Sequence, residues 1–448
     1  MANTNWEAKN LNQKQIATIV VANTWAQNDT ATITIDGIDF VITIGTLVTT
    51  AQVATTIQQA LSGTTLTDTS ASCVPTIAQG GARAIPQFRD FTATVSSSTV
   101  SLTAAVTGAT GEQTQPFTVS GSETTAGTGT ITVTSAATAH KGRHDATDAD
   151  NWSAGAALAD NDAVFFLSGS GGMYDNLAVT CQPLTINKSK AFTGRVGRYS
   201  INKFNSNSIY YYPEYRSLYF TTDDNLATTT ANLEIGEGQG SGLFMWDAGA
   251  GQVLLNIFGQ GQPYIEGVPC VLFKGSHASN EVNNVAGNLG IAWLEGETAV
   301  VPALQTGNGP GSIARTTCKS GVTLTTVLMH GGYLSTDSAF TTGTITNGDW
   351  EHGLGTATTV NVDGGKFWPT KSATITTLRI GSGGEFNTGR GTDPFAITNA
   401  VIMRKGAIFR DPQGRAGNVT ITLQGCKLQE VTIETGPGKT YTITQSQS

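Results

Sequence analysis

Two carboxylates in the carboxyl-terminal half of the chain are the best candidates for catalysis. Asp349 and Glu351 lie two residues apart, with Trp350 between them and His352 after them. An extended strand would place both carboxylates on one side. Such a pair can cleave polysaccharide when one carboxyl acts as acid and the other as base or nucleophile, about 5 to 9.5 Å apart. Side chains on one strand project in parallel, so we expect both to be exposed and non-catalytic.

Other polar pairs give weaker signals. Asp223 and Asp224 are neighbours and would face opposite ways in a strand. His140 and His144 lie four apart beside three aspartates, which suits a metal site, but no helix is predicted there to align the two rings. A solvated linker is the favoured interpretation of this segment. The sequence contains no catalytic triad, zinc-protease, phosphate-loop or nucleotide-binding motif, so we expect no metal and no cofactor.

An aromatic cluster is the best candidate for a binding surface. Its members are Tyr210, Tyr211, Tyr212, Tyr215, Tyr219 and Phe220. Aromatic rings supply large contact area at low entropic cost, which favours packing or a subunit contact. Stacking on a glycan is the alternative interpretation.

The elements that would position these residues form a repeat. Five strings share a polar residue, a Gly, two further residues and a Leu or Phe, and β-branched alternating runs precede them; the strings are HGGYL, DGGKF, SGGEF, KGAIF and QGCKL, ending at Leu334, Phe367, Phe386, Phe409 and Leu428. The last four end 19, 23 and 19 residues apart. A strand and a Gly corner in each unit of about 20 residues are typical of a solenoid.

This pattern predicts a parallel β-helix. The Gly would turn the chain with positive φ, and the five Leu and Phe side chains would form one interior stack. The interval of 33 residues from Leu334 to Phe367 is too long for one coil and short for two, so NGDW at 347–350 is interpreted as a degenerate coil.

The rest of the chain suggests three segments. Residues 1–134 contain strand patterns and one helical pattern, TTAQVATTIQQALSG, which Thr50 could cap and Gly63 could end. This predicts a small α+β domain, a sheet covered on one side by a helix. Residues 135–150 are predicted to be a linker, and residues 151–448 the β-helix body. The predicted fold class is therefore mainly β.

Composition limits the possible functions. Charged residues make up 13% of the chain and the net charge is −8, which argues against a nucleic-acid partner. No export signal and no apolar run of about 20 residues is present, so we expect synthesis in a cytoplasm without membrane insertion. The five cysteines have no close pair, which favours reduced, buried thiols.

Two stretches resemble phage proteins. TITIDGIDFVITIG, TTAQVATTIQQAL, FTATVSSSTVSLTAAVTG and PFTVSG, in this order, resemble a domain that recurs in tail and other virion proteins of bacteriophages and prophages. DNWSAGAALADNDAVFFLSGSG and LTINKSKAFTGRVG resemble prophage-encoded structural proteins whose bodies are β-helical. This second resemblance implies a structural role without an active site.

Together these observations favour a non-enzymatic structural protein of a phage virion. It would be a tail fibre, a spike or a capsid-decorating protein, made in the host cytoplasm and assembled into the virion. A solenoid has open strand edges at its ends, which predicts self-association, with a homotrimer expected. Its expected partners are itself, other virion proteins and a host surface glycan. The alternatives are a polysaccharide-depolymerising tailspike and a non-viral cell-surface adhesin.

Overall fold

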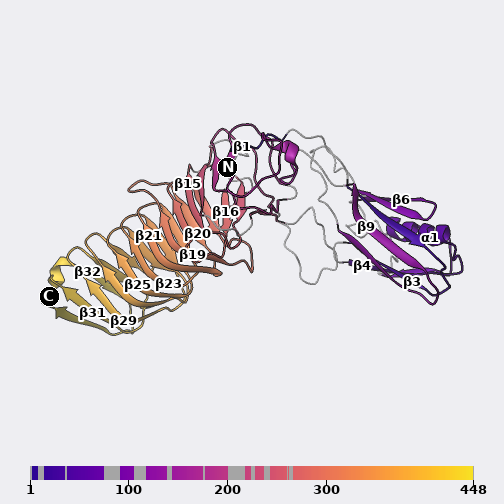
Figure 1. Ribbon diagram of the computed structural model, residues 1–448. Coiled ribbons are helices and arrows are strands. Elements are labelled where there is room, and N and C mark those ends of the chain that lie inside the picture. Colours follow the sequence, from indigo (N-terminus) through magenta and orange to yellow (C-terminus); the bar gives the residue numbers. More distant parts are fainter. Residues whose placement is uncertain are drawn as a thin grey trace. The chain divides into compact units, whose positions relative to one another are not determined.

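The computed structural model describes residues 3–8, 15–35, 38–74, 91–104, 118–138, 144–174, 177–199, 217–222, 228–236, 243–259, 261 and 266–446. These residues are mainly β, in two long parallel sheets and two shorter antiparallel ones (Figure 1). The chain divides into two compact units. The coiled unit comprises the described residues of Met1–Glu7, Trp152–Arg198 and Tyr219–Ser448. The amino-terminal unit includes the described residues of Ala8–Asn151.

The larger parallel sheet has 14 strands. In spatial order they are β1 (Asn3–Asn5), β10 (Ala163–Phe166), β11 (Thr185–Lys188), β13 (Thr229–Glu234), β15 (Val253–Phe258), β17 (Glu281–Asn284), β19 (Ala299–Thr306), β21 (Val322–Met329), β23 (Phe340–Ile345), β25 (Thr356–Val362), β27 (Thr374–Ile380), β29 (Ala396–Met403), β31 (Val419–Gln424) and β33 (Tyr441–Ser446).

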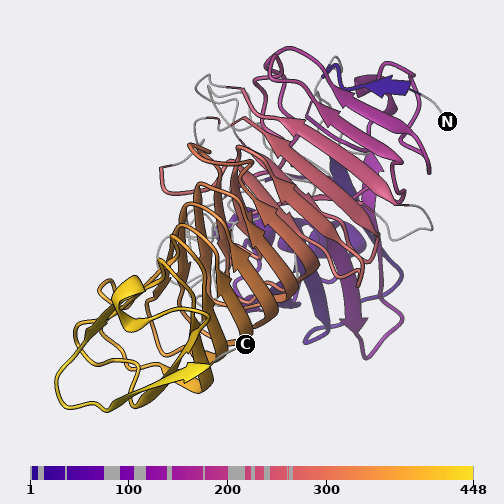
Figure 2. The same cartoon turned by 90° about the vertical axis from the view of Figure 1, so that its left-hand side faces the viewer.

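The smaller parallel sheet has 11 strands. They are β12 (Phe220–Thr221), β14 (Phe244–Asp247), β16 (Val271–Lys274), β18 (Asn288–Ile291), β20 (Arg315–Cys318), β22 (Tyr333–Thr336), β24 (Asp349–His352), β26 (Lys366–Pro369), β28 (Glu385–Asn387), β30 (Ile408–Asp411) and β32 (Thr432–Thr435). From β12 onward, consecutive strands alternate between the two sheets. One strand of each sheet, with the corners between them, is called a coil below; Figure 2 shows the coils stacked along one direction.

Apolar side chains from successive coils lie above one another in the interior. One column in the smaller sheet contains Phe244, Val271, Leu289, Thr316, Leu334, Trp350, Phe367, Phe386, Phe409 and Ile433. All except Ile433 are buried, and the phenyl rings of Phe386 and Phe409 stack at 5.3 Å. Strand alternation explains the column, because every second side chain points inward and the parallel register repeats the position in each coil.

The predicted interior stack is confirmed for four of its five members and wrong for the fifth. Leu334, Phe367, Phe386 and Phe409 are 0% exposed, whereas Leu428 is 53% exposed. Leu428 begins a short 3-10 helix, η5 (Leu428–Glu430), outside the strands. Ile433 takes the expected place, in register with Phe409. In the other four strings a strand begins within the string, after the Gly corner, whereas QGCKL leads into this 3-10 helix.

The interval from Leu334 to Phe367 holds an additional regular coil. Leu334 pairs with Trp350 and Trp350 pairs with Phe367, at intervals of 16 and 17 residues. The NGDW segment is therefore not degenerate. Coils of this unit vary in length at their corners, while the short strands keep the same inward and outward alternation.

Glycines form the corners, as predicted. In the five strings, one Gly of each has a φ between 65° and 80°, and Gly348 in the additional coil has a φ of 92°. Crowding also requires Gly at some corners, because a Cβ on Gly332 would lie 2.2 Å from the carbonyl oxygen of Ala314 in the preceding coil. Positive φ and close stacking of backbone together explain the Gly positions.

The first strand belongs to the coiled unit, which moves a predicted boundary. β1 pairs in parallel with β10, about 160 residues later in the sequence. Trp6 follows β1 and packs edge-on against Trp152 with ring centroids 5.0 Å apart. The predicted domain of residues 1–134 therefore does not include its first residues, which begin the larger parallel sheet.

The amino-terminal unit contains two antiparallel sheets, where the sequence predicted one. Their spatial orders are β6-β7-β2-β9 and β5-β4-β3-β8. The strands are β2 (Ile16–Ala22), β3 (Thr30–Ile35), β4 (Ile38–Thr43), β5 (Ser72–Val74), β6 (Phe91–Ser96), β7 (Thr99–Ala104), β8 (Val119–Thr124) and β9 (Thr130–Thr138). Asp36 and Gly37, between β3 and β4, lie outside the described residues.

Helix α1 (Thr50–Ser62) packs on these strands through Val53, Ile57 and Leu61. Its N-cap is Thr49 and not the predicted Thr50, because the Thr49 hydroxyl accepts a hydrogen bond from the Gln52 backbone in a capping box. Gly63 ends the helix with a φ of 63°, as predicted. The helix is short, and in the described part of the chain no helix has the length and hydropathy needed to cross a membrane.

The predicted linker at residues 135–150 contains strand residues and buried side chains. β9 extends to Thr138, and His144, Asp145 and Asp148 are each less than 9% exposed. The Asp145 carboxylate accepts hydrogen bonds from the backbone and hydroxyl of Thr147. A 3-10 helix, η3 (Ala149–Asn151), follows directly after Asp148. The interpretation of this segment as a solvated linker is therefore wrong for its second half.

Candidate functional site

Strand β24 holds the candidate catalytic pair on the outer side of the smaller sheet. The side chains of Asp349 and Glu351 point outward, 41% and 25% exposed, whereas Trp350 and His352 point inward and are completely buried. The period-two alternation of a strand explains this division. The two carboxylates therefore lie side by side on one surface, as expected from their spacing.

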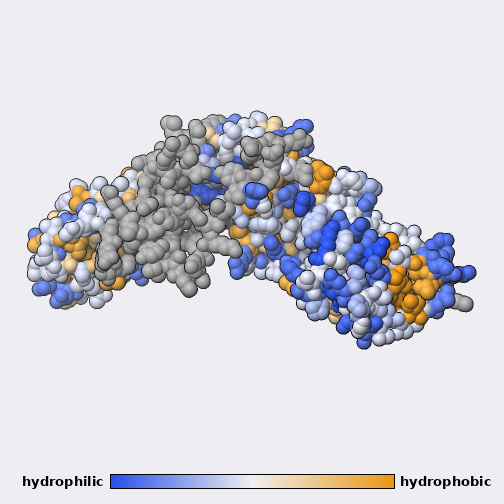
Figure 3. All heavy atoms as spheres, turned by 180° about the vertical axis from the view of Figure 1, so that it is seen from behind, coloured by the Kyte–Doolittle hydropathy of each residue, from blue (hydrophilic) through white to orange (hydrophobic). Residues whose placement is uncertain are grey.

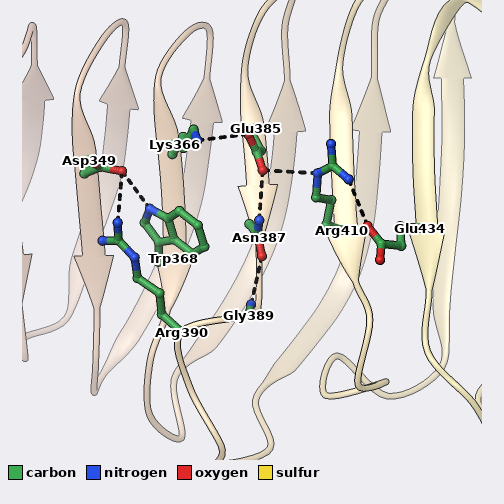
Figure 4. Close-up of polar contacts among 9 residues, drawn as sticks. All are labelled: Asp349, Lys366, Trp368, Glu385, Asn387, Gly389, Arg390, Arg410 and Glu434. Carbon is green, nitrogen blue, oxygen red and sulfur yellow. Dashed lines mark hydrogen bonds and ion pairs between the residues drawn. The ribbon is translucent and has the colours of Figure 1, made fainter.

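One guanidinium contacts both carboxylates. Arg390 lies in the loop after β28, and its side chain extends back along the sheet toward β24 (Figure 4). Its Nη1 donates to the Glu351 carboxylate at 2.7 Å, and its Nη2 lies 3.7 Å from the Asp349 carboxylate. Neutral donors add to this contact, because the Trp368 indole donates to Asp349 at 2.9 Å and the Tyr333 hydroxyl donates to Glu351 at 2.8 Å.

The charged network continues across the following coils. Glu385 lies 3.6 Å from the Lys366 ammonium and 3.2 Å from the Arg410 guanidinium. Arg410 then donates to Glu434 at 2.9 Å, and Asn387 donates to Glu385 at 2.8 Å (Figure 4). These residues lie on β26, β28, β30 and β32, so the network joins four successive coils. Exposed ion pairs of this kind contribute about 0.2–1 kcal/mol each.

The aromatic ring beside the carboxylates is not the expected one. Trp350 separates the two carboxylates in the sequence, but its ring lies in the interior column between Leu334 and Phe367. Trp368 occupies the outer surface instead, in register with Glu351. Arg390 covers its ring at 4.1 Å from the centroid, so Trp368 is only 9% exposed. Alternation from Phe367 was the signal that could have placed Trp368 outside.

This arrangement does not have the features of a hydrolytic centre. Both carboxylates accept hydrogen bonds, whereas a general acid must have a proton to donate. They project from one strand and do not face each other across a cleft. Arg390 and the two neutral donors already contact both carboxylates. The geometry is that of a surface network that braces the coils.

The structure describes only two residues of the aromatic cluster. Tyr210, Tyr211, Tyr212 and Tyr215 lie outside the described residues, as do Asp223 and Asp224. Tyr219 is 8% exposed, its hydroxyl donates to Glu297 at 2.9 Å, and the Lys274 ammonium lies 4.6 Å from its ring centroid. Phe220 is fully buried in β12. These two rings are thus engaged in packing and are not free to form a binding surface.

The histidine and aspartate cluster also lies only partly within the described residues. His140 lies outside the described residues, and His144 is buried. Within the described ranges, no group of three or more His, Cys, Asp or Glu side chains is arranged to hold a metal ion. The five cysteines are not joined by disulfide bonds; Cys73 is half-buried and the other four are buried. Burial raises the pKa of the Cys73 thiol to about 11, which disfavours the reactive thiolate.

His352 is an ionisable side chain inside the coils. Its Nδ1 lies 3.0 Å from the Thr336 hydroxyl, and its ring packs against Phe340 and Phe367. Its Nε2 has no hydrogen-bond partner, although the Gly355 backbone lies near enough to favour the charged ring. Burial dominates and lowers the pKa of His352 to about 4, so this histidine is neutral at pH 7.

Lys188 in β11 is a second buried ionisable residue. It is 1% exposed, and its ammonium donates to the carbonyl oxygen of Phe192 at 2.9 Å. Burial lowers its pKa to about 8, and the nearby Cys270 opposes this change. Neither buried site can be recognised from the sequence, since both residue types are also common on strand surfaces.

Comparison of the chain with protein-family models, with curated proteins and with solved structures found no match in any of the three. The function is therefore argued from the fold and from the geometry of the outer face of the smaller sheet.

Proposed function

We propose that the two parallel sheets form a parallel β-helix and that the chain is a non-enzymatic structural protein of a phage virion. In this proposal it is a tail fibre, a spike or a capsid-decorating protein. It is made in the host cytoplasm, and it associates with itself as a homotrimer and with other virion proteins. A host surface glycan is a further proposed partner. The smaller amino-terminal unit is proposed to be an α+β attachment domain.

The observation that carries this proposal is the continuous register of the coils. In the larger sheet, neighbouring strands from β10 to β33 pair in parallel, and inward side chains lie in register with inward side chains of the next coil. Each coil buries its apolar side mainly against its neighbours, so a long stack forms an elongated and rigid body. Rigid elongation suits a protein that spans a distance in an assembly. The resemblance of both parts of the chain to phage proteins supports the same function.

The candidate pair supports the non-enzymatic form of this proposal. A depolymerising tailspike needs two carboxylates at a substrate groove, and Asp349 and Glu351 instead share one arginine on a flat sheet. Arg390, Trp368 and Tyr333 contact these carboxylates, which favours a structural use of their charges.

Locating the protein in the particle tests the virion proposal. We expect the chain to sediment with particles released by host lysis and to be labelled on them by a specific antibody in electron micrographs. Particles from a host in which the gene is deleted provide the control. Recovery of the chain on the host cell surface, and none on particles, would support the adhesin alternative instead.

A separate assay tests the absence of catalysis. Purified protein incubated with host capsule or lipopolysaccharide is expected to release no reducing ends. The variants Asp349→Asn and Glu351→Gln serve as matched controls, because both keep the shape of the side chain and remove its charge. Release of reducing ends by the wild type that either variant abolishes would refute the structural proposal and support the tailspike.

A further inference from the structure

The outer side of the larger sheet differs in chemistry from the outer side of the smaller one. Two columns of outward positions run along the stack, one in register with Asn232 and the other in register with Thr342. Beside them, Glu234 and Phe258 form a shorter outward pair, in which Glu234 is charged. Among the described strands from β11 to β33, Glu281 and Arg379 are the only charged residues in the two columns. We call this surface the neutral face. The smaller sheet, in contrast, has the charged network on its outer side.

Threonine and asparagine dominate the neutral face. Thr326, Thr342, Thr359 and Thr377 follow one another in register in four successive coils. In the other column, an asparagine ladder runs through Asn187, Asn232, Asn256 and Asn283. These side chains are only partly exposed. The face is therefore polar without being charged, over most of the length of the sheet.

Several polar side chains of this face already bind one another. Asn256 donates to Asn232 at 3.1 Å, and Asn232 donates to Asn187 at 3.2 Å. Asn361 likewise donates to the Thr344 hydroxyl at 3.2 Å. Removing a polar group from water costs less free energy when the group keeps a hydrogen bond than when it is left without a partner. These internal bonds lower the cost of covering the neutral face.

We propose that the neutral face is the surface through which copies of this chain associate with one another. Two identical charged faces would repel when brought together, whereas two neutral faces do not. With strands about 4.8 Å apart and a rise of about 3.3 Å per residue, the face measures about 50 Å by 13 Å. The flat area is therefore about 650 Å², without the added surface of protruding side chains. A stable interface buries roughly 800 Å² of accessible surface per partner, which is close to this value.

This inference rests on the proposed homo-oligomer and assigns it a surface other than the aromatic cluster. Figure 3 shows hydrophobic side chains beside hydrophilic ones at the surface near the carboxyl-terminal end of the coiled unit. Within the neutral face, Leu254, Leu328 and Ile402 occupy outward positions between the polar residues. Scattered apolar groups in a polar, uncharged surface are typical of the composition of protein interfaces.

The test places like charges on the neutral face. The double variant Thr342→Arg and Thr359→Arg puts two cations side by side in adjacent coils, and Thr317→Arg puts one on the outer side of the smaller sheet as a control. Sedimentation velocity at micromolar concentration gives the mass of each, and circular dichroism shows whether each is folded. We expect an oligomer for the wild type and for Thr317→Arg, and a 46.6 kDa monomer for the double variant.

A second measurement does not depend on a disruptive substitution. In a Cys73→Ser background, the remaining four cysteines are buried. Thr342→Cys should then be joined between copies by a bismaleimide, whereas Thr317→Cys should not. An oligomeric double variant without cross-linking at Thr342 would overturn the assignment of the face and leave the proposed oligomer intact. A monomeric wild type would overturn both.

Discussion

Acidification should destabilise the coiled unit through His352. The ring is fully buried, and its pKa of about 4 lies below the usual 6.5 because of this burial. A proton added to the ring would place a positive charge inside the coils, where the effect of burial outweighs that of the nearby Gly355 backbone. The folded protein therefore binds this proton only near pH 4, whereas the unfolded chain binds it near pH 6.5.

The sign of the effect follows from this difference. Between pH 6.5 and 4 the unfolded chain binds the proton and the folded chain does not, so the free energy of unfolding falls as the pH falls through this window. Above pH 6.5 both states are neutral, and the contribution is fully present. A shift from 6.5 to about 4 corresponds to about 3 kcal/mol in total.

The assay is denaturant unfolding of the wild type and of His352→Gln between pH 4 and 7.5. Glutamine does not titrate, so the difference between the two proteins isolates the histidine from the many carboxylates that also titrate. We expect the free energy of unfolding of the wild type to fall, relative to the variant, by about 3 kcal/mol over this range. His330→Gln, at the surface of the same unit, is the control for replacing a histidine elsewhere in the coils. Parallel pH profiles for the wild type and His352→Gln would refute the reasoning.

Two further predictions concern the interior and the corners of the coils. Phe386→Ala should lower the free energy of unfolding by about 3–5 kcal/mol, because the ring is fully buried between Phe367 and Phe409; Phe258→Ala, at a position 39% exposed, should cost less in the same denaturant titration. Gly332→Ala and Gly383→Ala both place alanine at a φ near 80°, but only the first brings a Cβ within 2.2 Å of another atom. Thermal unfolding should show a loss of about 1–2 kcal/mol for Gly383→Ala and a larger one for Gly332→Ala, and equal losses would contradict the crowding argument.

The sequence predicted the repeating part of the fold well, because its signals are local. Alternation of apolar and polar residues places every second side chain inside, and a Gly corner with positive φ can be recognised without knowledge of its neighbours. The same alternation correctly placed Asp349 and Glu351 outside. It failed at Leu428, where a similar string leads into a 3-10 helix, and at the 33-residue interval, where the additional coil has a Trp in place of the Leu or Phe.

Contacts between distant residues could not be predicted in this way. Arg390 contacts Asp349 and Glu351 from a loop about 40 residues later, and it also covers the ring of Trp368. The candidate carboxylates are therefore part of a network of contacts between coils. The pairing of β1 with β10 across the amino-terminal unit is likewise invisible in either strand alone. Both contacts depend on the tertiary fold, which brings distant segments together. Many other residues or strands of the chain would fit the local sequence pattern equally well.

By itself, the sequence determined that the chain forms short strands with glycine corners, that charge is scarce and that the candidate carboxylates project from one surface. These properties follow from residue type and spacing, which act within a few residues. Only the tertiary structure decided which coil stacks on which, which side chains fill the interior column and which cation pairs with which carboxylate. The register between coils sets these contacts, and it arises from the combined packing of many coils and not from any one of them.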